Sequence, residues 1–480
     1  MSSSADKNKL HKAGGFHIEK IEVITSKGVV VDLLGILVHI TFFEDIQTTS
    51  ITGSCIINDM LALSTIGPII GQEYLRMKIT TSGLNEQESS YDFTENLLVV
   101  NSLTTKEDGA SGNEFLILEF STAELQRDQR TRINQSYSGS YSEIFKKIMR
   151  DHIGTKKKLY VEPSRGTKKI VFPNFSPFEA INMMKRQAVS AHDGSPTYMF
   201  FEDFKGYHFR SLSSMYAEPT IHTYETSVPG SKPNDPVSDL SAVSEYQIQS
   251  IGDSAAAQRL GSYGSELISY DTYTRRRTTT TYNYLENFKN ETHVTSGKDK
   301  SIKQFPLISA TPVQGKSRMS DFPARRYFLP SANFVDSNNN YTDLTVLHDE
   351  KGRPVYNSIQ SETWLQRRAS QLLQLDRGIT CSIKTNGNTL IDCGDVVEFN
   401  LPAVSAAKTE DNDKFDFFYR GRFLIRRIRQ DFDVSARKHD SIMTLVKDSL
   451  QKELLSADES LEIEPEENDE VIEKFYINEQ

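Results

Sequence analysis

Short runs of alternating apolar and polar residues, separated by turn residues, dominate the first part of the chain. Runs rich in β-branched and aromatic side chains favour strands, because these side chains pack well on a pleated surface. The runs include residues 29–31, 37–43, 52–57, 74–79, 97–103 and 115–120. Six or more strands at this spacing predict a small antiparallel barrel or sandwich over residues 16–126.

The apolar pattern then changes to a helical period. Ser140 with Glu143, and Ser176 with Glu179, are spaced as capping boxes ahead of apolar residues that recur at helical spacing. Two β-rich runs follow on either side of the turn Lys205-Gly206, which predicts a β-hairpin. Two helices and a hairpin together predict a small α+β domain.

The second half of the chain begins with a linker and returns to strands. Residues 225–237 are rich in Pro, Gly, Ser, Asn and Asp, and strand patterns follow over 239–271. Residues 273–355 are polar and irregular, and a helix is predicted from about 358 to 375. Strand patterns then close the fold between residues 379 and 446.

The most informative pattern is a weak internal repeat. Residues 96–125 align with residues 421–450 without a gap, at an offset of 325, and apolar positions coincide along the whole window. Upstream, Gly71 aligns with Gly394 at an offset of 323. Earlier still, residues 53–59 resemble residues 264–271, with one extra residue in the second copy.

The order of these matches indicates two related barrels, the second interrupted by an insertion. The alternative is coincidence between two generic β meanders. If the repeat is real, three chains would place six similar barrels in a ring of approximate six-fold symmetry, while the other domains would keep three-fold symmetry.

Composition and charge limit the classes of function. Apolar residues make up 37% and charged residues 25% of the 480 residues, which is typical of globular domains. The net charge is −10, but the last thirty residues hold eleven acids and two lysines, so the rest of the chain is nearly neutral. A neutral body does not favour a nucleic-acid binder with a basic surface. We expect the acidic tail to be a solvated extension whose apolar end could dock on a partner.

The cysteines and the first residues indicate the cell compartment in which the protein folds. Three scattered cysteines (Cys55, Cys381 and Cys393) indicate no disulfide framework and no zinc site, and fit folding in a reducing cytoplasm. No apolar run reaches the roughly 18 residues that cross a bilayer, and residues 1–12 lack the apolar core of an export signal. We therefore expect neither membrane insertion nor export.

Motifs for common chemistry are missing from the sequence. It contains no Gly-x-Ser-x-Gly elbow, no phosphate loop and no close pairing of histidines, so we expect no catalytic residues, no cofactor and no metal. The acidic run 410–413 lacks the glycine and the terminal glutamate of a calcium loop. Acid pairs for glycoside cleavage depend on three-dimensional geometry, so a β-rich cell-wall or polysaccharide hydrolase is an alternative from another class.

Several segments resemble one protein family. Residues 394–402 (GDVVEFNLP), 419–425 (YRGRFLI) and 443–448 (MTLVKD) resemble the C-terminal region of the baseplate central hub proteins of contractile-tail bacteriophages. The segments FSPF at 175–178 and FFE at 200–202 resemble the middle domain of that family. Residues 273–355 and the acidic tail match nothing in it.

The resemblance implies a structural role without catalysis. Hub proteins of this family are homotrimers with two tail-tube-like barrels per subunit. They cap the tail tube on one side, carry the central spike on the other, and are surrounded by wedge proteins. For this chain the resemblance implies a place in the virion, with assembly in the host cytoplasm and DNA passing through only in transit. A phage-like contractile injection or secretion particle is the alternative setting.

The expected fold is therefore α+β and mainly β, with two tail-tube-like antiparallel barrels, a small α+β domain and an inserted β-rich region. The expected divisions are an N-terminal arm (1–15), the first barrel (16–126), the α+β domain (127–215), a linker (216–237), the second barrel (238–272 plus 378–450), an insertion ending in a helix (273–377) and an acidic tail (451–480).

Two sets of residues are candidates for contacts with other chains. Turn and strand residues equivalent in the two predicted barrels, with a basic strand face, are expected in the ring or against the tube: Gly71, Tyr74, Arg76, Gly394, Asp395, Glu398, Arg427 and Arg429. A basic run and the apolar end of the tail are expected to dock partners: Arg275, Arg276, Arg277, Phe475 and Tyr476.

Overall fold

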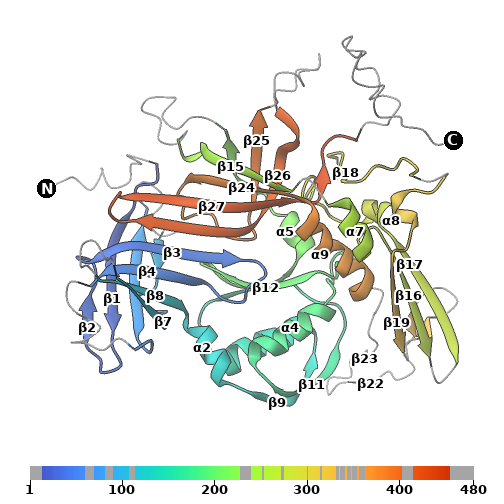
Figure 1. Ribbon diagram of the computed structural model, residues 1–480. Coiled ribbons are helices and arrows are strands. Elements are labelled where there is room, and N and C mark those ends of the chain that lie inside the picture. The colour runs from blue at the N-terminus through green and yellow to red at the C-terminus, as the bar shows by residue number, and fades with distance from the viewer. Residues whose placement is uncertain are drawn as a thin grey trace, which may run out of the picture.

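The computed structural model describes residues 13–59, 70–81, 90–107, 114–226, 239–250, 253–271, 275–299, 301–313, 316–330, 363–402 and 415–454, with four two-residue strands between 334 and 355. Strands dominate, and one sheet of fourteen strands runs through most of the molecule (Figure 1). The predicted fold class, mainly β with an α+β domain and an inserted β-rich region, is confirmed.

The first β-unit is an antiparallel sheet near the N-terminus. Along the chain it contains β1 (His17–Ile24), β2 (Val30–Asp32), β3 (Leu37–Asp45), β4 (Thr52–Asn58), β5 (Tyr74–Thr80), β6 (Ser90–Asp92), β7 (Leu98–Glu107) and β8 (Glu114–Thr122). In space their order is β3-β4-β8-β7-β5-β1-β2, with β6 beside β5. Alternate side chains of β4 and β5 are buried, as the period-two pattern predicts, and they enclose a core of their own.

The middle domain follows and combines helices with short strands. Its elements are α2 (Ala123–Arg130), β9 (Ile133–Gly139), α3 (Tyr141–Ile148), β10 (Lys158–Val161), β11 (Lys168–Phe175), α4 (Pro177–Gln187), β12 (Tyr198–Asp203), β13 (Gly206–Ser211) and α5 (Leu212–Tyr216). Both predicted capping boxes are present, because Ser140 and Ser176 each accept a hydrogen bond from the backbone N–H three residues on. The predicted hairpin around Lys205-Gly206 is the β12–β13 pair.

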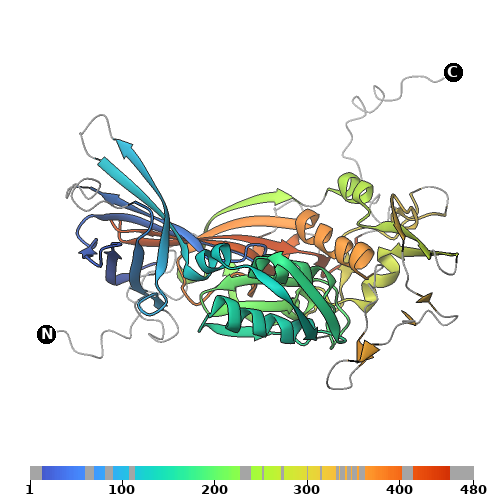
Figure 2. The same cartoon turned by 90° about the horizontal axis from the view of Figure 1, so that it is seen from below.

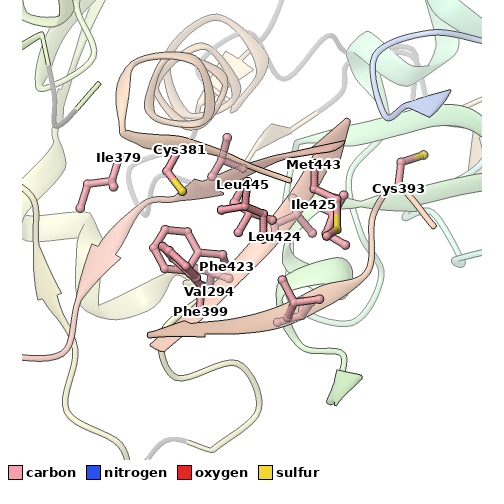
Figure 3. Packing of buried hydrophobic residues seen from close by; sticks show 14 of the residues in the cluster. Val294, Ile379, Cys381, Cys393, Phe399, Phe423, Leu424, Ile425, Met443 and Leu445 are labelled. Carbon is pink, nitrogen blue, oxygen red and sulfur yellow. The ribbon is translucent and has the colours of Figure 1, made fainter. Parts of the chain in front are cut away.

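The second β-unit closes the chain. It contains β14 (Thr220–Glu225), β15 (Val243–Ser250), β24 (Ile379–Asn386), β25 (Val396–Pro402), β26 (Phe415–Asp433) and β27 (Lys438–Lys447), in the spatial order β15-β24-β27-β26-β25-β14. A bridge between Glu225 and Ala242 brings the end of β14 back to the start of β15. The predicted linker therefore contains a strand of this unit. Figure 3 shows its core around Phe399, Phe423 and Leu445.

The insertion lies at the opposite end of the molecule from the first β-unit (Figures 1 and 2). It consists of α7 (Ser254–Leu260), β16 (Gly264–Asp271), β17 (Arg276–Asn283), α8 (Tyr284–Asn287), β18 (Phe305–Pro306), β19 (Arg325–Pro330), the strand pairs β20 (Phe334–Val335) with β21 (Tyr341–Thr342) and β22 (Leu347–His348) with β23 (Pro354–Val355), a π-helical turn (Thr363–Arg367) and α9 (Arg368–Arg377). β18 pairs with β28 (Ser449–Leu450).

One prediction about this region is wrong. Residues 264–271 were expected in the second barrel, but β16 lies between β17 and β19 in a separate three-stranded sheet. The helix α7 separates this sheet from β15. The similarity of residues 53–59 to residues 264–271 therefore reflects a shared strand pattern and not a shared position in the fold.

The tip of the β12–β13 hairpin joins the middle domain to the first β-unit. Phe204, at this tip, stacks on Tyr91 with ring centroids 3.6 Å apart. Its ring also lies 5.4 Å from that of Phe42 and 5.8 Å from that of Phe93. Aromatic pairs at such distances are favourable beyond the area that they bury. The hairpin tip thus completes the aromatic core of the neighbouring unit.

We expect Phe204→Ala to destabilise the protein by about 3 kcal/mol, the lower end of the range for truncating a buried phenylalanine, because the ring is only partly buried. Urea unfolding monitored by fluorescence measures the change. The matched control is Phe328→Ala, since Phe328 is 74% exposed and its truncation should cost less than about 0.5 kcal/mol. Equal midpoints for the two variants would contradict the role assigned to Phe204.

Candidate assembly interface

The two β-units repeat the same hairpin in the same register. Val100 of β7 faces Phe120 of β8, and Ile425 of β26 faces Leu445 of β27, both at the predicted offset of 325. Each hairpin has one register shift, between Val100 and Ser102 in the first and between Ile425 and Arg427 in the second. A bulge at the same step is a specific feature that two unrelated meanders would not share.

The neighbouring strand is also repeated. β4 pairs with β8 as β24 pairs with β27, and every facing pair from Thr52 to Asn58 recurs from Thr380 to Asn386. Three residues are identical in the two strands: Thr52 and Thr380, Ser54 and Ser382, and Asn58 and Asn386. The second copy of β4 is therefore β24, and not the segment 264–271.

The match extends to the outer strands. β3 pairs with β4 as β15 pairs with β24, and the register shift between Leu37 and His39 recurs between Val243 and Glu245. The insertion thus occupies the place of the short β3–β4 turn of the first unit. The core strand order is the same in both units, and the units differ at the strand next to it. In the first unit β1 runs antiparallel to β5, whereas in the second unit β14 runs parallel to β25.

One predicted alignment is shifted by a residue. Tyr74 faces Val99 in the first unit and Val396 faces Leu424 in the second, so these strands correspond at an offset of 322 and not 323. Gly71 and Gly394 both have left-handed backbones, with φ of 83° and 85°, just ahead of the strands. Because glycine adopts this conformation without strain, it starts both strands with a sharp turn.

The two units are joined edge to edge by β26. Its second half pairs antiparallel with β3, from Arg427 facing Asp45 to Asp433 facing His39. Side chains reinforce this joint: Arg427 Nε lies 2.8 Å from Asp45 Oδ2, and Thr41 Oγ1 donates to Asp431 Oδ1 over 2.8 Å. We call this pairing the internal joint. It makes the sheets of the two units continuous.

The predicted ring residues lie in different surroundings. Arg427 and Arg429 belong to the internal joint, where the Arg429 guanidinium lies 5.7 Å from the centre of the Phe43 ring. Tyr74 is exposed, and Arg76 pairs with Glu22 of β1 at 3.2 Å. Glu398 accepts a hydrogen bond from Asn400 within β25. Of the predicted ring residues, the structure thus brings Arg427 and Arg429 to the joint between the two β-units, while Asp395 lies against Lys205 of the middle domain.

The predicted docking residues are far from that boundary. Arg276 begins β17, and Arg275 and Arg277 are exposed beside it at the end of the molecule formed by the insertion. Phe475 and Tyr476 lie outside the described residues, as does the acidic run 410–413.

A polar junction with buried carboxyl groups around the exposed Lys205 links the first β-unit, the middle domain and the second β-unit, and of its residues only Asp395 is predicted from the sequence as a contact residue. Lys205, next to Phe204 at the hairpin tip, extends its ammonium group to Asp392 Oδ2 at 2.9 Å and Asp395 Oδ2 at 3.2 Å in the second unit. Glu44 of the first unit accepts a hydrogen bond from the backbone N–H of Cys393. Asp203 completes the group and lies 2.7 Å from His208 Nε2.

Three of these carboxyl groups, those of Glu44, Asp392 and Asp395, have a pKa above the ordinary value. Burial away from water, with the charge of Asp203 next, raises the pKa of Asp392 to about 8. Burial also raises the pKa of Glu44 well above its ordinary value, with Asp392 adding to the effect. Burial opposes the charge on Lys205, but Asp392 and Asp395 outweigh it and raise the lysine pKa. Glu44 Oε1 and Asp392 Oδ1 have no hydrogen-bond partner among the described residues.

A second buried network ties the middle domain to the first unit. Glu202 of β12 accepts hydrogen bonds from the backbone N–H of Ile51 and from the hydroxyl of Thr122. Lys157 lies 2.5 Å from Glu202 and 3.0 Å from Glu124. Because each buried charge has an opposite charge and hydrogen-bond partners, the network fixes the orientation of the middle domain.

The described residues offer neither a clustered metal site nor a membrane-spanning helix. Across those ranges, no group of three or more His, Cys, Asp or Glu side chains is arranged to hold a metal ion. Within the same ranges, no helix has the length and apolar character needed to cross a bilayer.

The fold is similar to those of solved phage tail proteins. A tail protein from Neisseria meningitidis matches 90% of this chain and 97% of its own, at 11% identity and a TM-score of 0.48. The 43 kDa tail protein of prophage MuSo2 from Shewanella oneidensis matches 89% and 98%, at 10% identity and a TM-score of 0.48. An E. coli component of the type VI secretion system, described as similar to phage T4 tail proteins gp27 and gp5, matches 92% and 79%, at 10% identity and a TM-score of 0.34.

These structures are described as tail proteins and a secretion-system component. At these identities and scores the likeness assigns no activity or partner to this chain. Neither a protein-family model nor a curated protein sequence matches it.

The polar junction makes stability depend on pH. An unfolded aspartate has a pKa of about 3.9 and the folded Asp392 has one of about 8, so between these pH values the folded state binds one more proton than the unfolded state. The free energy of unfolding should therefore fall as the pH rises from about 5 to about 8, by up to about 4 kcal/mol for this group.

The variant Asp392→Asn removes this titration, so we expect its unfolding midpoint to change less over the same pH range. Urea unfolding at pH 5, 6.5 and 8 measures the slope. Asp32→Asn, which removes an exposed carboxyl group from β2, is the matched control and should keep the wild-type slope. A slope unchanged by Asp392→Asn would show that this carboxyl group does not bind the extra proton.

Proposed function

We propose that this chain is the structural hub of a phage tail baseplate. Three chains form a ring of six similar β-units, which joins the hexameric tail tube to a trimeric central spike. Wedge proteins assemble around the ring, and DNA passes through its channel during ejection. The hub is part of the virion and assembles in the host cytoplasm. The observation that carries the proposal is the repeated β-unit, with the same register and the same bulges in both copies.

The repeat supports an adapter between two symmetries. A closed ring of three identical chains has three-fold symmetry, and two similar units in each chain give its rim an approximate six-fold symmetry. The middle domain and the insertion occur once per chain, so they present three-fold surfaces. One molecule can then match a six-fold partner on one side and a three-fold partner on the other.

The internal joint supports the ring geometry. Within one chain β26 already holds the two units side by side through backbone hydrogen bonds, so the step from one unit to the next is defined. Repeating such a step around an axis closes a ring when the rotation per step is right. The exposed basic residues Arg275 and Arg277, on the insertion, are candidates for contact with the surrounding proteins.

The proposed role requires no chemistry from the chain, and the sequence resemblance to contractile-tail hubs points to the same assembly. The geometry would serve a phage-like injection particle equally well, because such a particle also joins a tube to a spike. Neighbouring capsid and terminase genes would indicate a phage.

The mass of the purified protein tests the proposal. Multi-angle light scattering at micromolar concentration should give three times the 54.4 kDa mass of the chain, alone or with the spike protein added. Addition of tail tube protein should then give a larger complex that contains three hub chains. A stable monomer in the presence of both partners would contradict the hub assignment.

A further inference from the structure

The repeat leaves two strand edges without the partner that their counterparts have. β15 corresponds to β3, but among the described residues it pairs only with β24, whereas β3 pairs with both β4 and β26. β7 corresponds to β26, and its second half pairs only with β8 within the described chain. Within the part of the chain that the structure describes, one internal joint is therefore formed, and the two edges for a second joint of the same kind have no partner strand.

Exposure at equivalent positions distinguishes the formed joint from the open edges. Ile40 and Phe42 of β3 are completely buried, whereas their equivalents Tyr246 and Ile248 of β15 are 50% and 41% exposed. On the other side of the joint Ile428 is buried, and its equivalent Leu103 of β7 is only partly buried. Large apolar side chains at these positions are thus covered where a joint exists and uncovered where none is made.

We propose that β15 of one chain pairs antiparallel with β7 of a second copy, in the register of the internal joint. Applying the offsets of the repeat to that joint gives the facing pairs. The pair Phe42 and Gln430 of the internal joint corresponds to Ile248 and Thr105 in the proposed joint. In the same way, the pair Thr41 and Asp431 corresponds to Gln247 and Lys106. Ile40 facing Phe432 becomes Tyr246 facing Glu107. This inference rests on the proposed ring and adds which edges meet, and in which register.

The second copy is the occupant that fits both edges. An open edge presents unpaired N–H and C=O groups that an added strand can satisfy. The two open edges lie on different units of the same chain, so a contact between them is head-to-tail and can propagate around an axis until the ring closes. The internal joint demonstrates that a β3-type edge and a β26-type edge are complementary in this protein.

A cysteine pair tests the register directly. Directly opposite residues in antiparallel strands have Cα atoms roughly 4.5–5.5 Å apart, which a disulfide can span. Lys106→Cys with Gln247→Cys is the informative pair, because the equivalent side chains Thr41 and Asp431 are hydrogen-bonded to each other. The three native cysteines are buried. Mild oxidation of the full-length double variant, followed by a non-reducing gel, should give covalent dimers and trimers.

The matched control moves one cysteine by two residues along the same strand. Lys106→Cys with Glu245→Cys keeps the same alternation of side chains on β15 but breaks the register, so we expect at least ten-fold less cross-linking. The single variants should give no trimers, because a chain with one new cysteine can join at most one other chain. The internal pair Thr41→Cys with Asp431→Cys should form its bond within one chain and verifies the oxidation conditions.

Failure of this inference and failure of the proposed function have different signatures. A trimer by light scattering without Lys106–Gln247 cross-links, or with equal cross-linking of the control pair, would overturn the strand joint and leave the hub role standing. The same result is expected if another segment of the chain occupies the β15 edge. A chain that stays monomeric with tube and spike proteins present would overturn both.

Discussion

The fold depends on one long strand that belongs to two sheets. β26 runs for 19 residues, and its first half pairs with β25 while its second half pairs with β3, with β27 along its other edge. Backbone hydrogen bonds fix the register of each pairing, because a slip of one residue would turn every side chain to the other face. The orientation of one β-unit relative to the other is therefore set by the backbone and not by a surface contact, and side chains such as Arg427 and Asp45 only reinforce it.

The middle domain secures this arrangement with a single hairpin. Phe204 enters the aromatic core of the first unit, and the adjacent Lys205 pairs with the carboxylates of the second. Lys205 itself is exposed, but Asp392 is buried, and a buried carboxylate without an opposite charge beside it is costly. The excess of carboxyl groups over cations around Lys205 keeps some of them protonated, which links the integrity of the three-part boundary to pH.

The repeat gives the described chain one strand joint of this kind, and the second joint belongs to the proposed ring. The insertion replaces the β3–β4 turn in the second unit, and the strand pairings of the repeat are kept except for one further register shift between Ile248 and Ser250, next to the insertion. Exposed Tyr246 and Ile248 mark the place where the second unit lacks the cover that the first unit has. In the proposed ring, backbone pairing of the same kind connects units within a chain and between chains, and the single-copy domains supply the three-fold features.

The sequence by itself determined the local elements and the repeat. The Ser140 and Ser176 caps, the hairpin at Lys205-Gly206 and the offset of 325 depend on short-range spacing, which the chain carries directly. It misplaced residues 264–271, because a strand pattern does not specify which sheet the strand joins, and the true match of β4 to β24 rested on only three identical residues. Only the tertiary structure decided that β26 reaches β3, that Arg427 pairs with Asp45, and that Glu44, Asp203 and Asp392 meet at Lys205. Those contacts join residues far apart along the chain, and their geometry comes from the packing of whole sheets.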